Sequence, residues 1–188
     1  MKKITTFVFA IMAGTALFAQ TTKWVFDNSH SKVRFAVSHM IISETEGQFK
    51  EYSGTVLADK EDFTDAKINF TIQTASIDTD NEKRDSHLKN DDFFDVEKYP
   101  TITLKNGILV KTSDGKYKLT GDYTMHGVTK ALSFDVKFGG IAEDPWGNTR
   151  AGFKIIGSID RTQFGMNGST QMVGTDVNVT INIELIKK

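Results

Sequence analysis

The sequence contains no cysteine. The chain therefore cannot form a disulfide, a cysteine-based zinc site or a thiol nucleophile, and it cannot carry a lipid on an N-terminal cysteine. Only 2 of its 188 residues are proline, whereas 15 are glycine. A chain of this length can bury one core without covalent cross-links. We therefore expect one domain built mainly from strands and turns.

An excess of positive charge is also missing. The chain has 23 basic and 24 acidic side chains, which gives a net charge of −1. Nucleic acids and anionic membranes attract proteins with strongly basic surfaces. The near balance of charge therefore argues against either partner.

Only the N-terminal stretch "MKKITTFVFAIMAGTALFAQ" contains a long apolar run. Two lysines precede this run, which extends for about 15 residues and is shorter than the roughly 20 that a membrane-spanning helix needs. These features predict a signal peptide over residues 1–19, cleaved after Ala19, rather than a membrane anchor. The mature domain, 20–188, should then be soluble, periplasmic or secreted, with no transmembrane anchor.

Most of the mature chain shows a hydrophobic period of two. Apolar and polar residues alternate in segments such as Val33 to His39, Tyr117 to Met125 and Val177 to Leu185. This alternation predicts about eight antiparallel strands, each with one apolar and one solvated face. The stretches "ADKEDFTDA", "SDGK", "EDPWGN" and "FGMNGS" separate the strands as connections or turns.

Such strands can close into a sandwich or a barrel. They are long for an immunoglobulin-like sandwich, and the Cys–Trp–Cys pattern of that fold is absent. We therefore predict an all-β fold, an antiparallel eight-stranded barrel with one short helix.

The predicted helix lies in "TDNEKRDSHLK", where the period of two is lost. Thr79 and Glu82 match a capping box, in which a threonine hydroxyl caps the helix and a glutamate follows three residues later. A helix from Asp80 to about Lys89 follows from this pattern. Arg84 and Asp85 are interpreted as an ion pair that ties this helix to the barrel.

The same stretch, "RDSHL", also suggests catalysis, because it brings together Asp85, Ser86 and His87. Neighbours on a helix point about 100° apart, so Ser86 and His87 cannot both face one reacting atom. The chain has four histidines, His30, His39, His87 and His126, but none of the usual metal-ligand spacings. We therefore expect that the chain is not an enzyme and binds neither a metal nor a cofactor. A histidine-based enzyme or metal protein is the weakest of the alternative functions.

Some inward positions favour a ligand inside the barrel. His39 continues the apolar face of Val33, Phe35 and Val37, so it is either a hydrogen-bonded core histidine or a group that meets the head of a ligand. Glycine at inward positions 121 and 157 either leaves room or marks a bend in a strand. An eight-stranded barrel is either filled by its own side chains or holds one slim molecule.

Several motifs in order carry a resemblance to a known family. They are "WVFDNSHSKVRFAVSHM", "GQFKEYSGTV", "RDSHL", "FFDVEKYP", "LTGDYTMHGVTK" and "GSIDRTQFGM". Together they cover nearly the whole mature chain, which resembles the YceI-like family of exported lipid- or polyisoprenoid-binding proteins. One departure is isoleucine after the His39–Met40 pair, where the family often has glycine.

The resemblance implies a lipocalin-like barrel, a short helix at one end and an elongated apolar interior that takes a long-chain lipid, either an isoprenoid or an acyl chain. It implies a carrier or scavenger rather than an enzyme, and it leaves a homodimer open. The alternative function is a filled barrel that serves as a stress-related or partner-binding module. The expected ligand-binding residues are Phe35, Val37, His39, Phe49, Phe70, Ile72, Leu104, Tyr123, Phe134, Phe153, Ile155 and Phe164. The expected helical cap consists of Arg84, Asp85, His87, Leu88 and Phe94, with Phe93 also turned toward the barrel.

Overall fold

The computed structural model of the chain describes residues 21–188, so the predicted signal peptide lies outside the described range. Within this range no helix is long and apolar enough to cross a membrane. The elements in chain order are β1 (Lys23–Phe26), β2 (Lys32–His39), β3 (Ser43–Phe49), β4 (Tyr52–Leu57), β5 (Lys67–Gln73), η1 (Thr74–Ser76), β6 (Ile77–Asp78), α1 (Glu82–Lys89), β7 (Thr101–Ser113), β8 (Lys116–Met125), β9 (Val128–Glu143), β10 (Thr149–Asp160), η2 (Arg161–Phe164) and β11 (Val173–Lys187).

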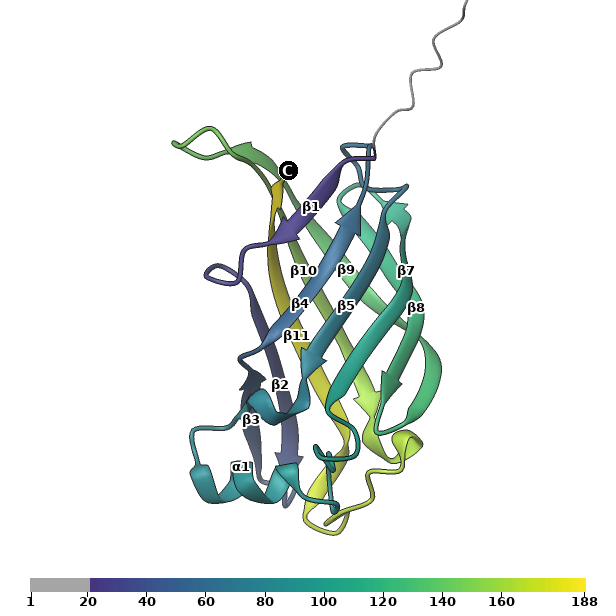
Figure 1. Ribbon diagram of the computed structural model, residues 1–188. Coiled ribbons are helices and arrows are strands. Elements are labelled where there is room, and N and C mark those ends of the chain that lie inside the picture. The colour runs from purple at the N-terminus through teal and green to yellow at the C-terminus, as the bar shows by residue number, and fades with distance from the viewer. Residues whose placement is uncertain (1–20) are drawn as a thin grey trace, which may run out of the picture.

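The strands close into an antiparallel eight-stranded barrel, as the alternation predicted. Three walls of the barrel are each built from two short strands. β1 and β2 pair with successive parts of β11, β4 and β3 pair with β1 and β2, and β5 and β6 pair with β4 and β3. The remaining strands, β7 to β11, each pair with the next one along the chain. Figure 1 shows these long strands tilted around a common axis.

The alternation places one face of each strand inside the barrel. Tyr117 and Leu119 on β8 are buried and lie opposite Val136 and Phe134 on β9, whereas Lys118 between them lies opposite exposed Asp135. Burial of a large apolar side chain contributes about 1.5–3 kcal/mol. A shift of one residue in this register would turn the whole apolar set toward water, so the pattern also fixes the pairing. The predicted turns occur where the sequence placed them, including Asp114–Gly115 between β7 and β8.

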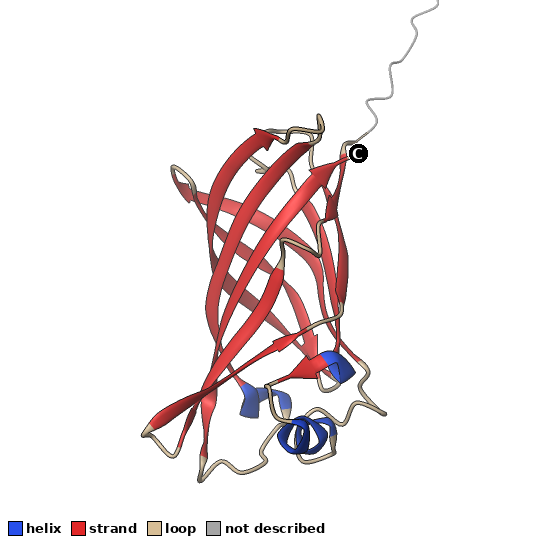
Figure 2. Ribbon diagram, turned by 90° about the vertical axis from the view of Figure 1, so that its left-hand side faces the viewer, coloured by secondary structure: helices blue, strands red, loops and turns tan. Residues whose placement is uncertain are grey.

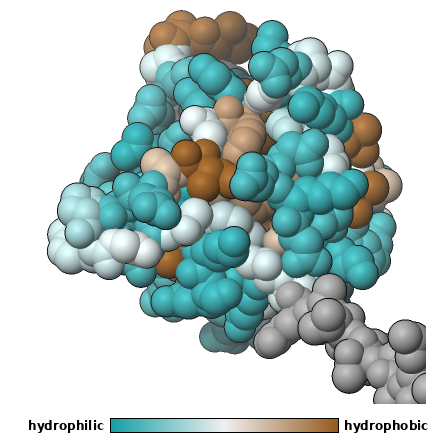
Figure 3. Space-filling view, turned by 90° about the horizontal axis from the view of Figure 1, so that it is seen from above, coloured by the Kyte–Doolittle hydropathy of each residue, from teal (hydrophilic) through white to brown (hydrophobic). Residues whose placement is uncertain are grey.

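One end of the barrel is closed by the connection between β4 and β5. The sequence suggested a polar connection here, but Phe63 within it is fully buried. Its ring packs 4.9 Å from Trp24, 4.9 Å from Phe153 and 5.6 Å from Phe138, measured between ring centroids. Figure 3 looks onto this end of the molecule and shows mostly hydrophilic side chains around a small apolar area.

The opposite end is covered by α1 and by the segments on either side of it, as Figure 2 shows. The helix is present, but the predicted capping box is wrong. The N-cap is Asn81, whose side chain accepts a hydrogen bond of 3.0 Å from the backbone N–H of Arg84. Asp80 has a left-handed φ of 59°, and this turn of the backbone places Asn81, rather than Thr79, at the start of the helix.

Candidate functional site

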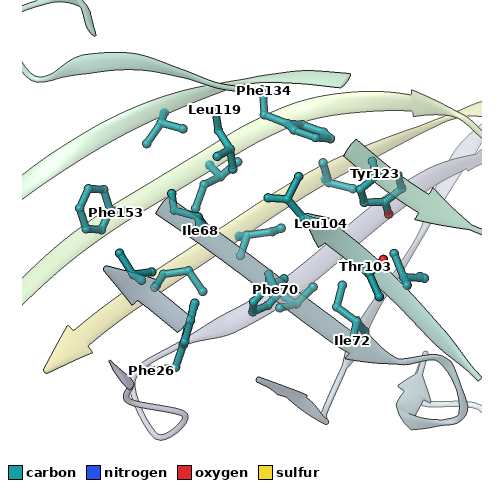
Figure 4. A pocket seen from close by; sticks show the side chains of 18 of the residues that line it. Phe26, Ile68, Phe70, Ile72, Thr103, Leu104, Leu119, Tyr123, Phe134 and Phe153 are labelled. Carbon is teal, nitrogen blue, oxygen red and sulfur yellow. The ribbon is translucent and has the colours of Figure 1, made fainter. Parts of the chain in front are cut away.

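The candidate site is the interior of the barrel, which contains two cavities. The upper cavity, toward the end that Phe63 closes, has a volume of about 130 Å³. Its walls are almost entirely apolar, and aromatic side chains contribute from several strands (Figure 4). Among the side chains labelled in Figure 4, only Thr103 and Tyr123 carry a polar atom. A space of this composition suits an apolar molecule or part of one.

The lower cavity lies between the helical cap and the interior of the barrel and has a volume of about 90 Å³. Leu88, Phe93 and Phe94 come from the helical cap, and Met125, Met166 and Val173 come from the neighbouring strand ends and turn. The two cavities share a ring of lining residues: Phe35, Phe49, Ile102, Tyr123, Ile159 and Val179. The shared ring means that the two cavities adjoin along the barrel.

Ten of the twelve residues expected to bind ligand line at least one of these cavities: Phe35, Val37, Phe49, Phe70, Ile72, Leu104, Tyr123, Phe134, Phe153 and Ile155. All ten lie on strands of the barrel wall, with their side chains on the inner face. Period-two alternation found nine of them, because it identifies the inner face of each strand. Phe49 was expected from the family motif "GQFKEYSGTV". Their contact with a ligand stays a prediction.

His39 and Phe164 line neither cavity. His39 is the last residue of β2, where it pairs with Ser43 and Val173, and it is only half-buried. The alternation continues through His39, but neither of the two cavities extends to it near the tip of the hairpin. Phe164 belongs to η2 and is buried in the packed wall, with its ring centroid 5.7 Å from that of Tyr123.

The two inward glycines do not leave empty space. A Cβ atom on Gly121 would come within 2.8 Å of Leu104 Cδ1, and one on Gly157 would overlap the ring of Phe134. The side chains of Leu104 and Phe134 therefore occupy the space beside these two glycines. Of the two readings of these glycines, the one that leaves room for a ligand is wrong.

Tyr123 is a polar group at the junction of the two cavities. Burial raises the pKa of its hydroxyl, so the phenol stays neutral under ordinary conditions. Within residues 21–188 its hydroxyl makes no hydrogen bond to protein, and it is free to donate one to a ligand or water.

Arg161 is a charged residue in the wall of the lower cavity. Its side chain is 3% exposed and donates hydrogen bonds to three backbone carbonyls: Nε to Gly174 at 2.9 Å, Nη1 to Met166 at 2.7 Å and Nη2 to Val173 at 2.9 Å. In the sequence this residue belongs to the family motif "GSIDRTQFGM" and was not expected to line the interior. A signal was nevertheless present, since position 161 continues the inward series of Gly157 and Ile159.

The predicted cap residues surround the lower cavity, but they are connected differently from the expectation. The prediction of an ion pair between Arg84 and Asp85 is wrong, because both side chains form hydrogen bonds with Thr79 instead. Arg84 donates to the Thr79 hydroxyl at 2.7 Å and to its carbonyl at 2.6 Å, and Asp85 accepts from the same hydroxyl at 2.6 Å. Thr79, 4% exposed, therefore holds the start of α1 to the barrel.

The other side of the cap is formed by His87, Leu88 and Phe94. Leu88 and Phe94 line the lower cavity. His87 bonds Asp92 at 3.1 Å, and its ring lies edge-on to Phe93 with the centroids 5.1 Å apart. Ser86 is exposed on α1, and no hydrogen bond joins it to His87 in the described chain. The arrangement gives His87 a packing role.

A polar cluster lies near the opposite end, where Asp27, His30 and Glu184 bring three potential metal ligands within 4.8 Å of one another. Arg150 lies beside them and donates Nη1 to both carboxylates, with 2.6 Å to Asp27 Oδ2. Its Nε also pairs with Asp144 at 2.7 Å. The guanidinium thus supplies the positive charge that these carboxylates need, and the cluster is explained as an ion-pair network.

Three comparisons place this barrel among known proteins. The sequence profile of the YceI-like domain matches residues 24–185. A UPF0312 protein of Vibrio parahaemolyticus is 35% identical over 183 residues, covering 95% of each chain. The crystal structure of the Campylobacter jejuni YceI protein is 35% identical, with a TM-score of 0.72 over 80% of this chain and 90% of that one. A polyisoprenoid-binding domain from Saccharophagus degradans shares the fold at 13% identity, with a TM-score of 0.68 over 88% and 98%.

Proposed function

From the premise that this chain belongs to the YceI-like family, we propose that it binds one long-chain lipid inside its barrel and acts as an exported carrier or scavenger. The tail would run along the inner strand faces through both cavities. An isoprenoid is preferred to an acyl chain, because a relative of the same fold is described as polyisoprenoid-binding. The predicted signal peptide supports export.

The observation that carries this proposal is the pair of adjoining apolar cavities with their shared ring of residues. A slim chain that passes this ring would exchange water contact for contact with hydrocarbon walls. Burial of roughly 350 Å² of apolar ligand surface at about 25 cal/mol per Å² favours binding by roughly 9 kcal/mol before the costs of association. A dissociation constant in the micromolar range or below is then within reach.

Binding rather than catalysis fits the interior best. A catalytic site needs a nucleophile or an acid–base pair in contact with the substrate. The polar side chains in the cavity walls are few, and Tyr123, which the cavities share, stays neutral. Ser86 and His87, the sequence candidates for a nucleophile and a base, lie outside both cavities.

The direct test is native mass spectrometry of the purified protein, followed by lipid extraction and identification of what is released. A copurified or added lipid with a long apolar chain should appear at one per protein. The alternative of a filled barrel predicts that neither a lipid nor an apolar fluorescent probe binds. That result would overturn the proposal.

A blocking variant tests the route through the barrel. Val179 belongs to the shared ring, so Val179→Phe should obstruct the passage and weaken binding of long chains more than short ones. Asn178→Phe places the same ring at the neighbouring exposed position of β11 and serves as the control. Equal binding by both variants, with both folded, would contradict a tail that spans the two cavities.

A further inference from the structure

Four large apolar side chains are exposed together at the end of the barrel that α1 covers. Met40, Ile41 and Ile42 form the turn between β2 and β3 and are 54%, 97% and 83% exposed, and Met172, in the turn before β11, is 54% exposed. The backbone N–H of Met40 donates to the carbonyl of Met172 at 2.6 Å, so two segments far apart in the sequence form one surface. We call these four residues the apolar tip. In Figure 1, β2 runs toward the end where α1 lies.

The backbone of the tip is strained by the residues that it carries. The N–H of Ile42 donates to the carbonyl of His39 at 3.2 Å and closes the turn. The two central residues of the turn, Met40 and Ile41, have left-handed φ values of 52° and 67°. Turns of this kind favour asparagine and glycine, and a β-branched residue such as isoleucine is an outlier there. Exposure to water and backbone strain both act against these side chains, and together they indicate a partner outside the folded chain.

The apolar tip adjoins the lower cavity. Val37 lies on β2 three residues before Met40, and Val173 follows Met172 directly. Both valines line the lower cavity, and Val173 also lies opposite His39, the last residue before the turn. A partner that binds the tip therefore lies beside the cavity in which, under the proposed function, a lipid is held.

The charges around the tip indicate the kind of partner. The two segments that carry it, 35–49 and 162–186, contain no lysine and no arginine. Proteins are attracted to anionic surfaces through such basic residues, so these segments do not favour an anionic partner. An uncharged or zwitterionic surface with an apolar interior fits them better.

The shape of the tip favours a bilayer over a protein. A stable protein interface uses about 20–30 residues on each side, whereas the tip offers four apolar residues on a projecting turn. Groups that bind in the membrane interface enter it by only about 5–10 Å. Exposed Glu44 follows Ile42 by two residues, about 7 Å along the strand. Its carboxylate therefore stays in water when Ile41 and Ile42 enter the bilayer.

We propose that the apolar tip inserts into one leaflet of a zwitterionic lipid bilayer and docks this end of the barrel on the membrane. The inference deepens the proposed function and rests on it in one respect, since docking places the lower cavity where a lipid would leave or enter the bilayer. The side chains of the tip exchange water for the acyl boundary, while Glu44 remains among the head groups.

The test measures binding of the purified protein to phosphatidylcholine vesicles by flotation. The unmodified protein should float with the vesicles, and addition of the anionic lipid phosphatidylglycerol should not strengthen binding. Ile41→Asn should weaken binding about tenfold, because it removes a large apolar side chain from the inserted surface. Its stability in urea should not fall, since asparagine tolerates a left-handed φ. Ile108→Asn makes the same substitution at a second exposed isoleucine, on β7, and should leave vesicle binding unchanged.

Three results would overturn the inference. The first is that the unmodified protein does not float, or that Ile41→Asn and Ile108→Asn bind vesicles equally. The second is binding that requires phosphatidylglycerol, because insertion of apolar side chains needs no anionic lipid. The third is a dimer in solution that Ile41→Asn dissociates, without vesicle binding, because a second copy of the chain would then cover the tip.

A tryptophan at the tip reports its position directly. The chain has two tryptophans, and in Ile41→Trp combined with Trp146→Phe the remaining one, Trp24, is buried. A change in emission then comes from position 41. The emission should shift to shorter wavelength when phosphatidylcholine vesicles are added, because the indole leaves water. In the unmodified protein Trp146 lies at the opposite end, and an equal shift there would contradict docking through the tip.

A transfer experiment separates this inference from the proposed function. Release of a pyrene-labelled alkane from the protein to phosphatidylcholine vesicles should accelerate with vesicle concentration and be about tenfold slower in Ile41→Asn, in proportion to the lost vesicle binding. A rate that does not depend on vesicle concentration would overturn lipid exchange at the docked end. If the pyrene-labelled alkane does not bind the protein, the proposed function has failed, while flotation still decides whether the tip docks on a bilayer.

Discussion

The ring of Phe35 occupies the space that a side chain at position 47 would fill. The two residues lie opposite each other on β2 and β3, and a Cβ atom on Gly47 would overlap the Phe35 ring. Phe35 belongs to the ring of residues shared by the two cavities. The glycine thus sets how far Phe35 leans away from the passage between them.

The first prediction follows from this contact. Gly47→Ala should lower the free energy of unfolding by about 1–3 kcal/mol, because Phe35 must move in a packed interior. It should also weaken the binding of long-chain ligands. Urea denaturation and probe displacement measure the two effects. Gly152→Ala is the control, since a Cβ there meets nothing within 4 Å. Similar values for both variants would show that the Phe35 contact is unimportant.

The second prediction concerns the buried plug at the upper end. Phe63→Ala should lower the free energy of unfolding by about 3–5 kcal/mol, because it removes a fully buried aromatic ring and leaves a void. Trp146→Ala removes an aromatic side chain that is 81% exposed and should change stability little. Chemical denaturation of both variants provides the comparison. A small effect for Phe63→Ala would mean that the upper end is not closed by this residue.

The third prediction addresses how the cap is attached. Thr79→Val keeps the shape of the side chain but removes the hydroxyl that binds Arg84 and Asp85. It should lower the free energy of unfolding by about 1–3 kcal/mol, because polar partners lose a buried hydrogen bond. Hydrogen exchange in α1 should accelerate at the same time.

Two further variants check that interpretation. Thr55→Val makes the same change at an exposed position on β4 and should have little effect. Arg84→Ala removes one of the two partners of Thr79 and should change both stability and the rate of lipid uptake. If neither quantity changes, the cap does not depend on Arg84.

The fourth prediction is a pH dependence from the network around Arg150. A hydrogen bond from Ser29, opposed by burial and helped by Arg150, holds the pKa of Asp27 well below its ordinary 3.8. For Asp144, burial acts to raise the pKa, but hydrogen bonds from Asn148 and Arg150 lower it well below the ordinary value. As the pH falls toward and below 3.8, Asp27 and Asp144 bind protons in the unfolded chain but remain ionised in the folded chain.

The stabilisation from these two carboxylates is therefore complete above about pH 5 and is lost as the pH falls below about 4. Denaturation at a series of pH values between 7 and 2 should show this decline. Asp144→Asn should make the decline shallower, whereas Asp114→Asn, at a fully exposed turn position, should not. A decline of equal steepness in both variants would place its origin in other carboxylates.

Much of the barrel could be predicted from local patterns. A period of two fixes which side of a strand faces inward, so segments such as Tyr117 to Met125 identified both the strands and nine of the cavity-lining residues. The hairpin at Asp114–Gly115 was equally local, because its residues suit a tight turn. The sequence also predicted a helix in the right place, although its cap is Asn81 rather than Thr79.

What lies opposite an inward side chain was decided only by the tertiary structure. Alternation treats His39 and Val37 alike, yet β2 carries His39 toward the hairpin tip, away from the cavities. It also cannot show that Leu104 and Phe134 fill the space beside the two glycines. Alternation also does not show that Arg161 is buried beside the lower cavity, where its side chain donates to carbonyls of Met166 and Gly174, at the two ends of the connection that follows it. The sequence alone determined which face of each strand points into the barrel. The cavities inside the barrel depend on how side chains that are distant in sequence pack against one another, which only the tertiary structure decides.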